Sequence, residues 1–373
     1  MTKTPLLRFV LLAAGVLHAA ALFALQPGER AASLAKTQWL NGVPFSLDPL
    51  ARDAEGPELR AAVFLLCRAA ITDENVANLA ALQRSLGGRL RCAIVTPDPD
   101  EDAKALLTRH PGLALPVGVD RERKITAQYM AGSLLYPQAF LVRRDGTILW
   151  RGEAVDLAEA VSRALDGKLD AKREAEISRR IDELQTLMRD REERRQRRVL
   201  DEIFRLSPDQ PAAIRMRLFV LENTGRRTEA WRFLNERLKA APGSARVYFT
   251  AIEFAGRAGI GDPELARLIR EFRRHISDPR MHLMMAWSLL VRFPENPTAL
   301  RAAAELLPAT GSDFNFYAAR AAFKTRVGDL AGALEDQQRA AAAARASGDE
   351  NAAAAALRSA EFLKTAIELG GKR

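Results

Sequence analysis

The sequence has few of the residues that most often carry chemistry. Only two cysteines and four histidines occur among its 373 residues. Two cysteines cannot staple a disulfide-rich scaffold, and the histidines are too scattered to give a metal site with ordinary ligand spacing. The phosphate-binding pattern GxxxxGK is also absent. We therefore expect no metal site and no cofactor.

Aromatic residues are scarce as well, at 6%, although the formal net charge is +9. Basic residues are interleaved with Asp and Glu, and only residues 189–198 hold a dense basic run. A nucleic-acid site needs a concentrated basic patch, so no nucleic-acid partner is expected. Hydrophobic content of 48% and charged content of 28% are typical of globular protein, and the length suggests two or three domains.

The first 25 residues resemble a targeting segment. Lys3 and Arg8 precede an apolar run over residues 9–25, and small residues lie near Ala24. This order predicts a signal peptide over residues 1–24. The alternative is an uncleaved anchor, since the run approaches the roughly 17 residues that a membrane span needs. In both cases we expect an extracytoplasmic protein, periplasmic or secreted, with residues 9–25 as a possible membrane tether.

Residues 30–168 alternate short apolar runs with helical patterns. Residues 61–66 and 90–95 are apolar without alternation, which is typical of parallel strands covered on both faces. Between them apolar residues recur at helical spacing, with Thr72 or Asp73 as the N-cap. These apolar residues are Val76, Leu79, Leu82 and Leu86. The pattern predicts a β-α-β unit.

The rest of this region predicts a helix, a hairpin and a second helix. The first helix covers residues 100–110. The hairpin joins residues 140–142 to 148–150, with Asp145 and Gly146 supplying positive φ angles. The last helix buries Leu157, Val161 and Leu165. Together these elements predict a four- or five-stranded mixed sheet flanked by helices.

The two cysteines are predicted to be free and buried. Cys67 ends the first strand, whereas Cys92 opens the second. In parallel neighbouring strands these positions lie near opposite ends of the sheet, and a disulfide needs Cα atoms within about 7 Å.

Residues 169–206 are predicted to form one long, charged connecting helix. Residues 170–206 contain no Pro or Gly, and one apolar stripe runs along them. The stripe consists of Ile177, Ile181, Leu184 and Met188.

Residues 207–373 contain a helical repeat. Gly225 and Gly328 are separated by about three periods of 34 residues, and Gly259 follows Gly225 by one period. Small residues follow the outer two glycines at Ala230 and Ala333. This pattern resembles the tetratricopeptide repeat, which implies a concave face suited to peptides, with residues 352–369 as the closing helix. The alternative is a plain helical bundle.

Residues 39–168 resemble the TlpA-type thioredoxin-like thiol-disulfide oxidoreductases. Three segments carry the resemblance: WLNGVPFSL, which begins at Trp39 and contains Asn41, Gly42, Pro44 and Leu47; the strand AAVFLL; and LLYPQAFLVRRDGTILWRG. The resemblance implies an α/β thioredoxin-like domain followed by the all-α repeat domain.

The family's Cys-x-x-Cys motif is missing. Aligning Phe64 with the family's strand aromatic places Ala69 and Thr72 on the two cysteine positions, with Cys67 two residues before the first. A thioredoxin nucleophile reacts as a thiolate at a helix N-terminus, and a second thiol resolves the mixed disulfide. Ala69 cannot attack and Thr72 cannot resolve.

The binding half of the family's machinery has counterparts here. Pro137 falls where the family has its cis-proline, so the resemblance implies that Tyr136 and Pro137 hold an extended peptide. The alternative is that Pro137 only shapes the start of the strand.

Three hypotheses follow. The first is a redox-inactive scaffold that binds proteins or peptides at the proline edge, at the concave repeat face, or at both. The second is a thiol-disulfide oxidoreductase or peroxidase-like enzyme that uses Cys67 as a single reactive thiol. The third is a membrane-tethered assembly factor. No catalytic residue other than Cys67 is proposed.

Overall fold

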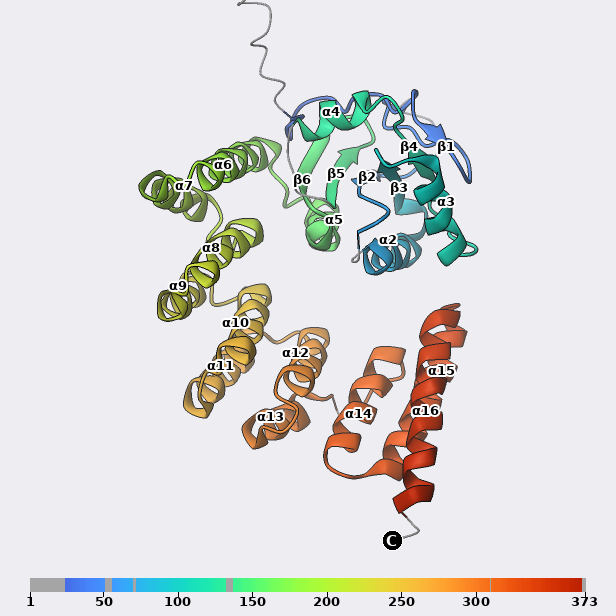
Figure 1. The fold of residues 1–373 in the computed structure, drawn as a ribbon, viewed down its shortest axis with the longest axis vertical. Helices are drawn as coiled ribbons and strands as arrows, with labels where there is room; N and C mark the ends of the chain where they lie inside the picture. The colour runs from blue at the N-terminus through green and yellow to red at the C-terminus, as the bar shows by residue number, and fades with distance from the viewer. Residues whose placement is uncertain (1–23, 51–55, 70–71, 132–136, 309, 371–373) are drawn as a thin grey trace, which may run out of the picture. The chain divides into compact units, whose positions relative to one another are not determined.

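The chain forms two compact units that divide after Ser207 (Figure 1). The computed structural model describes residues 24–50, 56–69, 72–131, 137–308 and 310–370. The predicted signal or anchor segment lies almost wholly outside these residues. Of the helices that are described, none has the length and apolar character needed to cross a membrane.

A six-stranded mixed sheet in the order β1-β4-β3-β2-β5-β6 forms the centre of the first unit. β2 is parallel to β3 and β3 to β4, whereas the other neighbours are antiparallel. The strands are β1 (Gln38–Trp39), β2 (Leu59–Phe64), β3 (Leu90–Thr96), β4 (Val117–Val119), β5 (Gln138–Arg143) and β6 (Ile148–Glu153). The predicted β-α-β unit is confirmed, but the predicted count of four or five strands is wrong. β1 and β4 are too short to give a periodic pattern.

Helices cover both faces of this sheet (Figure 1). Alternate strand residues, such as Ala61 and Val63, pack beneath α2 (Thr72–Leu86), α3 (Asp100–Arg109) and α5 (Leu157–Leu165). On the other face, Phe64 packs against α4 (Lys124–Met130) and the segment that precedes β2. Burial on both faces explains why β2 and β3 read as continuous apolar runs.

The hairpin between β5 and β6 differs from the predicted turn. Gly146 has a φ of 83°, but Asp145 is not among the residues with positive φ. The Arg143 amide donates to the Thr147 carbonyl at 2.8 Å, and the Gly146 amide donates to the Arg143 carbonyl at 3.0 Å. The loop is thus longer than a two-residue turn, and only the glycine needs a left-handed backbone.

The predicted long connecting helix is wrong, because residues 169–206 form a helical hairpin. α6 (Ala171–Arg189) and α7 (Glu193–Leu206) are separated by Arg191, whose φ is 59°. A left-handed non-glycine residue costs about 1–2 kcal/mol. Ile177, Ile181 and Leu184 of the predicted stripe are buried, although Leu187 and not Met188 completes the buried face. α7 also buries an apolar face, and this burial offsets the cost of the turn.

α6 belongs to the first unit, where it docks on β6. The Arg151 side chain is 2% exposed, and its guanidinium donates to both carboxylate oxygens of Asp182 at 2.8 and 2.9 Å. The Gln26 amide donates to the same carboxylate at 3.1 Å. Arg163 on α5 pairs with buried Glu174 on α6 at 2.8 Å.

The second unit is a series of helix pairs. The first helices form one layer and the second helices another (Figure 1). The pairs are α8 (Pro211–Asn223) with α9 (Arg227–Ala240), α10 (Ala245–Ala258) with α11 (Asp262–His275), α12 (Pro279–Arg292) with α13 (Pro297–Leu306), and α14 (Phe314–Arg326) with α15 (Leu330–Ala346), followed by α16 (Glu350–Gly370).

The predicted turn residues take the expected places in these pairs. Gly225, Gly259 and Gly328 have φ values of 71°, 67° and 84° at the ends of first helices. Ala230 and Ala333 are fully buried near the starts of second helices. The fold class is therefore an α/β domain with a mixed sheet followed by an all-α region of helix pairs, as the sequence predicts.

Candidate functional site

The residues aligned with the missing motif lie at the carboxyl edge of β2. Cys67 and Ala69 follow this strand, and Thr72 is the first residue of α2. Because β2 and β3 are parallel, Asp98, which follows β3, lies at the same edge. Its carboxylate accepts a hydrogen bond from the Cys67 amide at 2.5 Å.

The Cys67 thiol faces the core and not the solvent. Its residue is 3% exposed and belongs to the apolar cluster beneath α2 and α5. Burial raises the pKa of the thiol to about 11, and the carboxylates of Asp98 and Asp102 act in the same direction. A hydrogen bond with Thr96 and the charge of Arg109 lower the pKa, but by less. At pH 7 only about one molecule in ten thousand carries the thiolate.

Ala69 and Thr72 hold no reactive group at this edge. Ala69 is partly exposed, and its carbonyl accepts from the Thr72 amide at 3.0 Å. The Thr72 side chain is buried, and its hydroxyl donates to the Leu66 carbonyl at 2.6 Å. This hydroxyl therefore stabilises the turn into α2 and is not presented to a ligand.

A charged cluster that the sequence did not predict joins α2 to the end of α3. The Asp73 carboxylate contacts His110 Nε2 at 2.9 Å and Arg109 Nε at 3.1 Å. These two contacts hold the pKa of Asp73 below its usual range, with the His110 bond as the larger cause. Arg68 pairs with Asp102 at 2.5 Å. In the sequence, Arg109 is typical of the last turn of a helix. That pattern does not predict its contact with Asp73, which is far away along the chain.

Pro137 immediately precedes β5 and is partly exposed. Its carbonyl already accepts a hydrogen bond from the Ala154 amide at 3.0 Å. Tyr136, the other predicted peptide-binding residue, lies outside the described residues. Peptide binding at this edge therefore stays a prediction.

The second cysteine is deeply buried. Cys92 lies opposite Ala61 in the β2–β3 register, is 0% exposed, and is not disulfide-bonded. Burial raises its pKa to about 12. The prediction of two free, buried thiols is confirmed. Among the described residues, no group of three His, Cys, Asp or Glu side chains is placed to hold a metal ion.

The exposed large apolar side chains of the second unit avoid the layer of second helices. Within its described residues none lies on the second helices α9, α11, α13 and α15. They lie instead on α8, α12 and α16 and just after α14. These residues are Phe219, Met284, Trp287, Val291, Val327, Leu357, Phe362 and Leu369.

No family model matches the chain, and no curated protein matches it. Among solved structures, the putative thiol:disulfide interchange protein DsbE from Chlorobium tepidum is 20% identical, with 39% of this chain and 100% of that one covered and a TM-score of 0.32. StoA from Bacillus subtilis is 13% identical, with 34% and 93% covered and a TM-score of 0.27. The bacterioferritin comigratory protein from Xanthomonas campestris is 17% identical, with 40% and 94% covered and a TM-score of 0.28.

Proposed function

We propose that the chain is a redox-inactive, extracytoplasmic scaffold that binds protein or peptide partners. In this proposal the thioredoxin-like domain has lost its Cys-x-x-Cys, and the helix pairs are tetratricopeptide-like repeats with a peptide-binding face. The observation that carries the proposal is the burial of Cys67, whose raised pKa keeps it protonated.

Thiol-disulfide exchange needs a thiolate that attacks and a second thiol that displaces it from the mixed disulfide. Cys67 supplies little thiolate at neutral pH. Cys92 lies opposite Ala61 in the neighbouring strand. Cys67 follows Ala61 by six residues, so the two cysteines are six strand positions apart. At about 3.3 Å per strand residue, this separation is far beyond the reach of a disulfide. The described cysteines therefore give no resolving pair.

The helical unit supports a binding role. Phe362 is an apolar side chain that is 74% exposed. Contiguous exposed apolar surface marks interaction sites in soluble proteins. The extracytoplasmic assignment rests on the apolar run that follows Lys3 and Arg8.

Two assays test redox inactivity. The folded protein is expected not to accelerate insulin reduction by dithiothreitol. Its cysteines should react with a chromogenic disulfide such as Ellman's reagent only when the protein unfolds. Catalytic turnover of insulin, or rapid labelling of Cys67 in the native protein near pH 7, would refute the proposal.

The alternative is an oxidoreductase or peroxidase-like enzyme that uses Cys67 with an external thiol. One observation favours it, because Arg109 lies near this residue and lowers the pKa of its thiol. Burial has the larger effect in the opposite direction. The labelling assay separates the two functions. A membrane-tethered form differs only in the fate of residues 9–25, which mass spectrometry of the mature N-terminus determines.

A further inference from the structure

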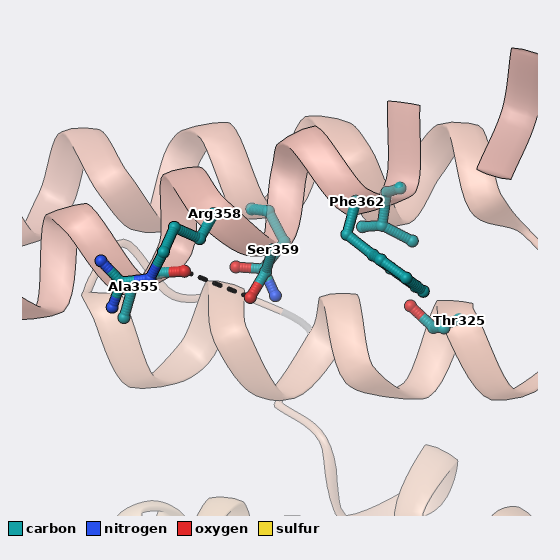
Figure 2. A pocket seen from close by; sticks show the side chains of 7 residues that line it. Thr325, Ala355, Arg358, Ser359 and Phe362 are labelled. Atoms are coloured by element: carbon teal, nitrogen blue, oxygen red, sulfur yellow. Dashed lines mark hydrogen bonds between the residues drawn. The ribbon is translucent and has the colours of Figure 1, made fainter. Parts of the chain in front are cut away.

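A groove crosses the last three helices of the second unit. Its volume is about 520 Å³, and Thr325 on α14, Gln337 on α15 and a stripe of α16 line it. The stripe includes Arg358, Ser359 and Phe362 (Figure 2). In this view the Phe362 side chain extends toward Thr325, so residues of α16 and α14 meet at the groove.

The groove exists because α16 packs on α15 through alanines. Ala340, Ala341 and Ala356 form one buried cluster. Ala353 and Ala360 extend the buried face of α16. Alanine permits close approach of the two helices, and of the larger side chains near this face Leu363 is buried whereas Leu357 and Phe362 stay exposed. Phe362 projects from the next face of the helix and is 74% exposed.

The hydrogen-bond donors that the groove can offer a ligand come from two side chains. The Thr325 hydroxyl donates to the Ala321 carbonyl at 2.8 Å, and the Ser359 hydroxyl donates to the Ala355 carbonyl at 3.2 Å. Both hydroxyl protons are therefore used within their own helices. The remaining side-chain donors in the groove are the Arg358 guanidinium and the Gln337 amide.

Arg358 makes no ion pair in the part of the chain that the structure describes, whereas two cations of α14 do. Arg320 and Lys324 both pair with the buried Asp336 carboxylate, at 2.5 and 2.9 Å. None of the ion pairs among the described residues includes Arg358. The groove thus offers an exposed aromatic ring beside an arginine that is not held in an ion pair.

We propose that this groove binds an acidic, apolar segment of a protein partner, an inference that rests on the proposed binding role and adds the chemistry of the partner. An apolar side chain of the segment packs on Phe362, and a carboxylate one helical turn away pairs with Arg358. A concave groove fits a peptide segment better than a flat lipid surface.

The test uses the full chain and short synthetic peptides that carry Leu or Phe one helical turn from Glu, with binding measured by fluorescence anisotropy. F362S and R358Q should each weaken binding by about tenfold or more. The matched controls are F219S and R280Q, which remove an exposed aromatic and an exposed arginine elsewhere on the first helices. They should change the affinity by less than about twofold.

Four results would overturn the groove assignment. These are no binding by any such peptide, equal binding of peptides with Lys in place of Glu, unchanged affinity in F362S and R358Q, and stronger binding to phosphatidylglycerol vesicles than to peptides. Binding that is lost in F219S but kept in F362S would place the peptide site on α8 and refute the groove assignment. The proposed scaffold role would not be affected. Circular dichroism confirms that each variant is folded.

Discussion

The side chains of Cys67 and Ala69 lie two positions apart but have opposite surroundings. Cys67 faces the core beneath α2, whereas Ala69 is partly exposed where the chain approaches the amino end of that helix. Thiolates are favoured by solvent and by the positive end of a helix, and disfavoured by apolar burial. Position 69 is thus suited to a reactive thiol that the sequence does not supply.

A cysteine introduced at position 69 should therefore react where Cys67 does not. We expect Ala69→Cys to add one thiol that Ellman's reagent labels in the native protein near pH 7, while Cys67 and Cys92 stay unlabelled until unfolding. The control is Ala69→Ser, which should label like the wild type. Equal labelling rates of Ala69→Cys and the wild type would show that the edge is closed to reagents.

The sequence identified Cys67 as a buried structural thiol, because apolar residues precede it along a strand. It did not reveal that Asp98 accepts from the Cys67 amide or that Asp73 contacts Arg109 and His110. Those contacts join residues more than thirty positions apart. Local periodicity holds no information on such pairs, because the parallel strand order alone brings them together.

At the scale of elements, the docking of α6 on β6 depends on the pair of Arg151 and Asp182. Asp182→Asn leaves the Arg151 charge buried without its carboxylate, and we expect a loss of about 2 kcal/mol in the free energy of unfolding. The loss is below that of a fully buried pair because the Asp182 side chain is 35% exposed. Urea denaturation measures the change.

Two comparisons give this prediction its control. Arg195→Gln breaks an exposed pair with Glu192 and should cost less than about 1 kcal/mol. Replacing both buried partners, in Arg151→Met with Asp182→Leu, should recover much of the lost stability. An equal loss in Asp182→Asn and Arg195→Gln would contradict the assigned role of the buried pair.

The contact between α5 and α6 should give stability a pH dependence. Burial raises the pKa of Glu174 above its ordinary value, although Arg163 acts against this. A carboxyl whose pKa is higher in the folded than in the unfolded protein contributes most to the free energy of unfolding at pH values below its unfolded pKa. This contribution is lost as the pH rises through the folded pKa. The stability of the wild type relative to Glu174→Gln should therefore fall from pH 4 toward pH 7.

Urea midpoints of both proteins across this range measure the trend. Glu176→Gln removes an exposed carboxylate from the same helix and controls for the change in net charge. A wild-type advantage that grows with pH would mean that the ion pair with Arg163 outweighs burial.

Elements with a clear period were predictable, and elements defined by a single turn were not. Apolar runs identified β2 and β3, and the spacing from Val76 to Leu86 identified α2. The break between α6 and α7 was missed because Arg191 takes a left-handed backbone without Gly or Pro to signal it. The benefit of the break comes from two stripes that bury each other, which is a tertiary effect.

At the scale of the whole molecule, the division after Ser207 predicts two independently folding units. We expect a fragment of residues 24–207 and a fragment of residues 208–373 each to unfold cooperatively. A fragment of residues 24–169 should be less stable than the first, because it lacks α6 and exposes Arg151. Thermal unfolding followed by circular dichroism provides the measurement. Equal stability of fragments 24–207 and 24–169 would show that α6 and α7 do not stabilise the first unit.

The helical hairpin of α6 and α7 begins and ends at neighbouring points. Asp170 caps the start of α6, and the Arg173 guanidinium donates to the Leu206 carbonyl at the end of α7. A rod of the same length would separate its two ends by about 55 Å. In the hairpin, the end of α7 instead lies beside the start of α6. During evolution a whole pair of helices could therefore be gained or lost at this junction while the chain on either side kept its course.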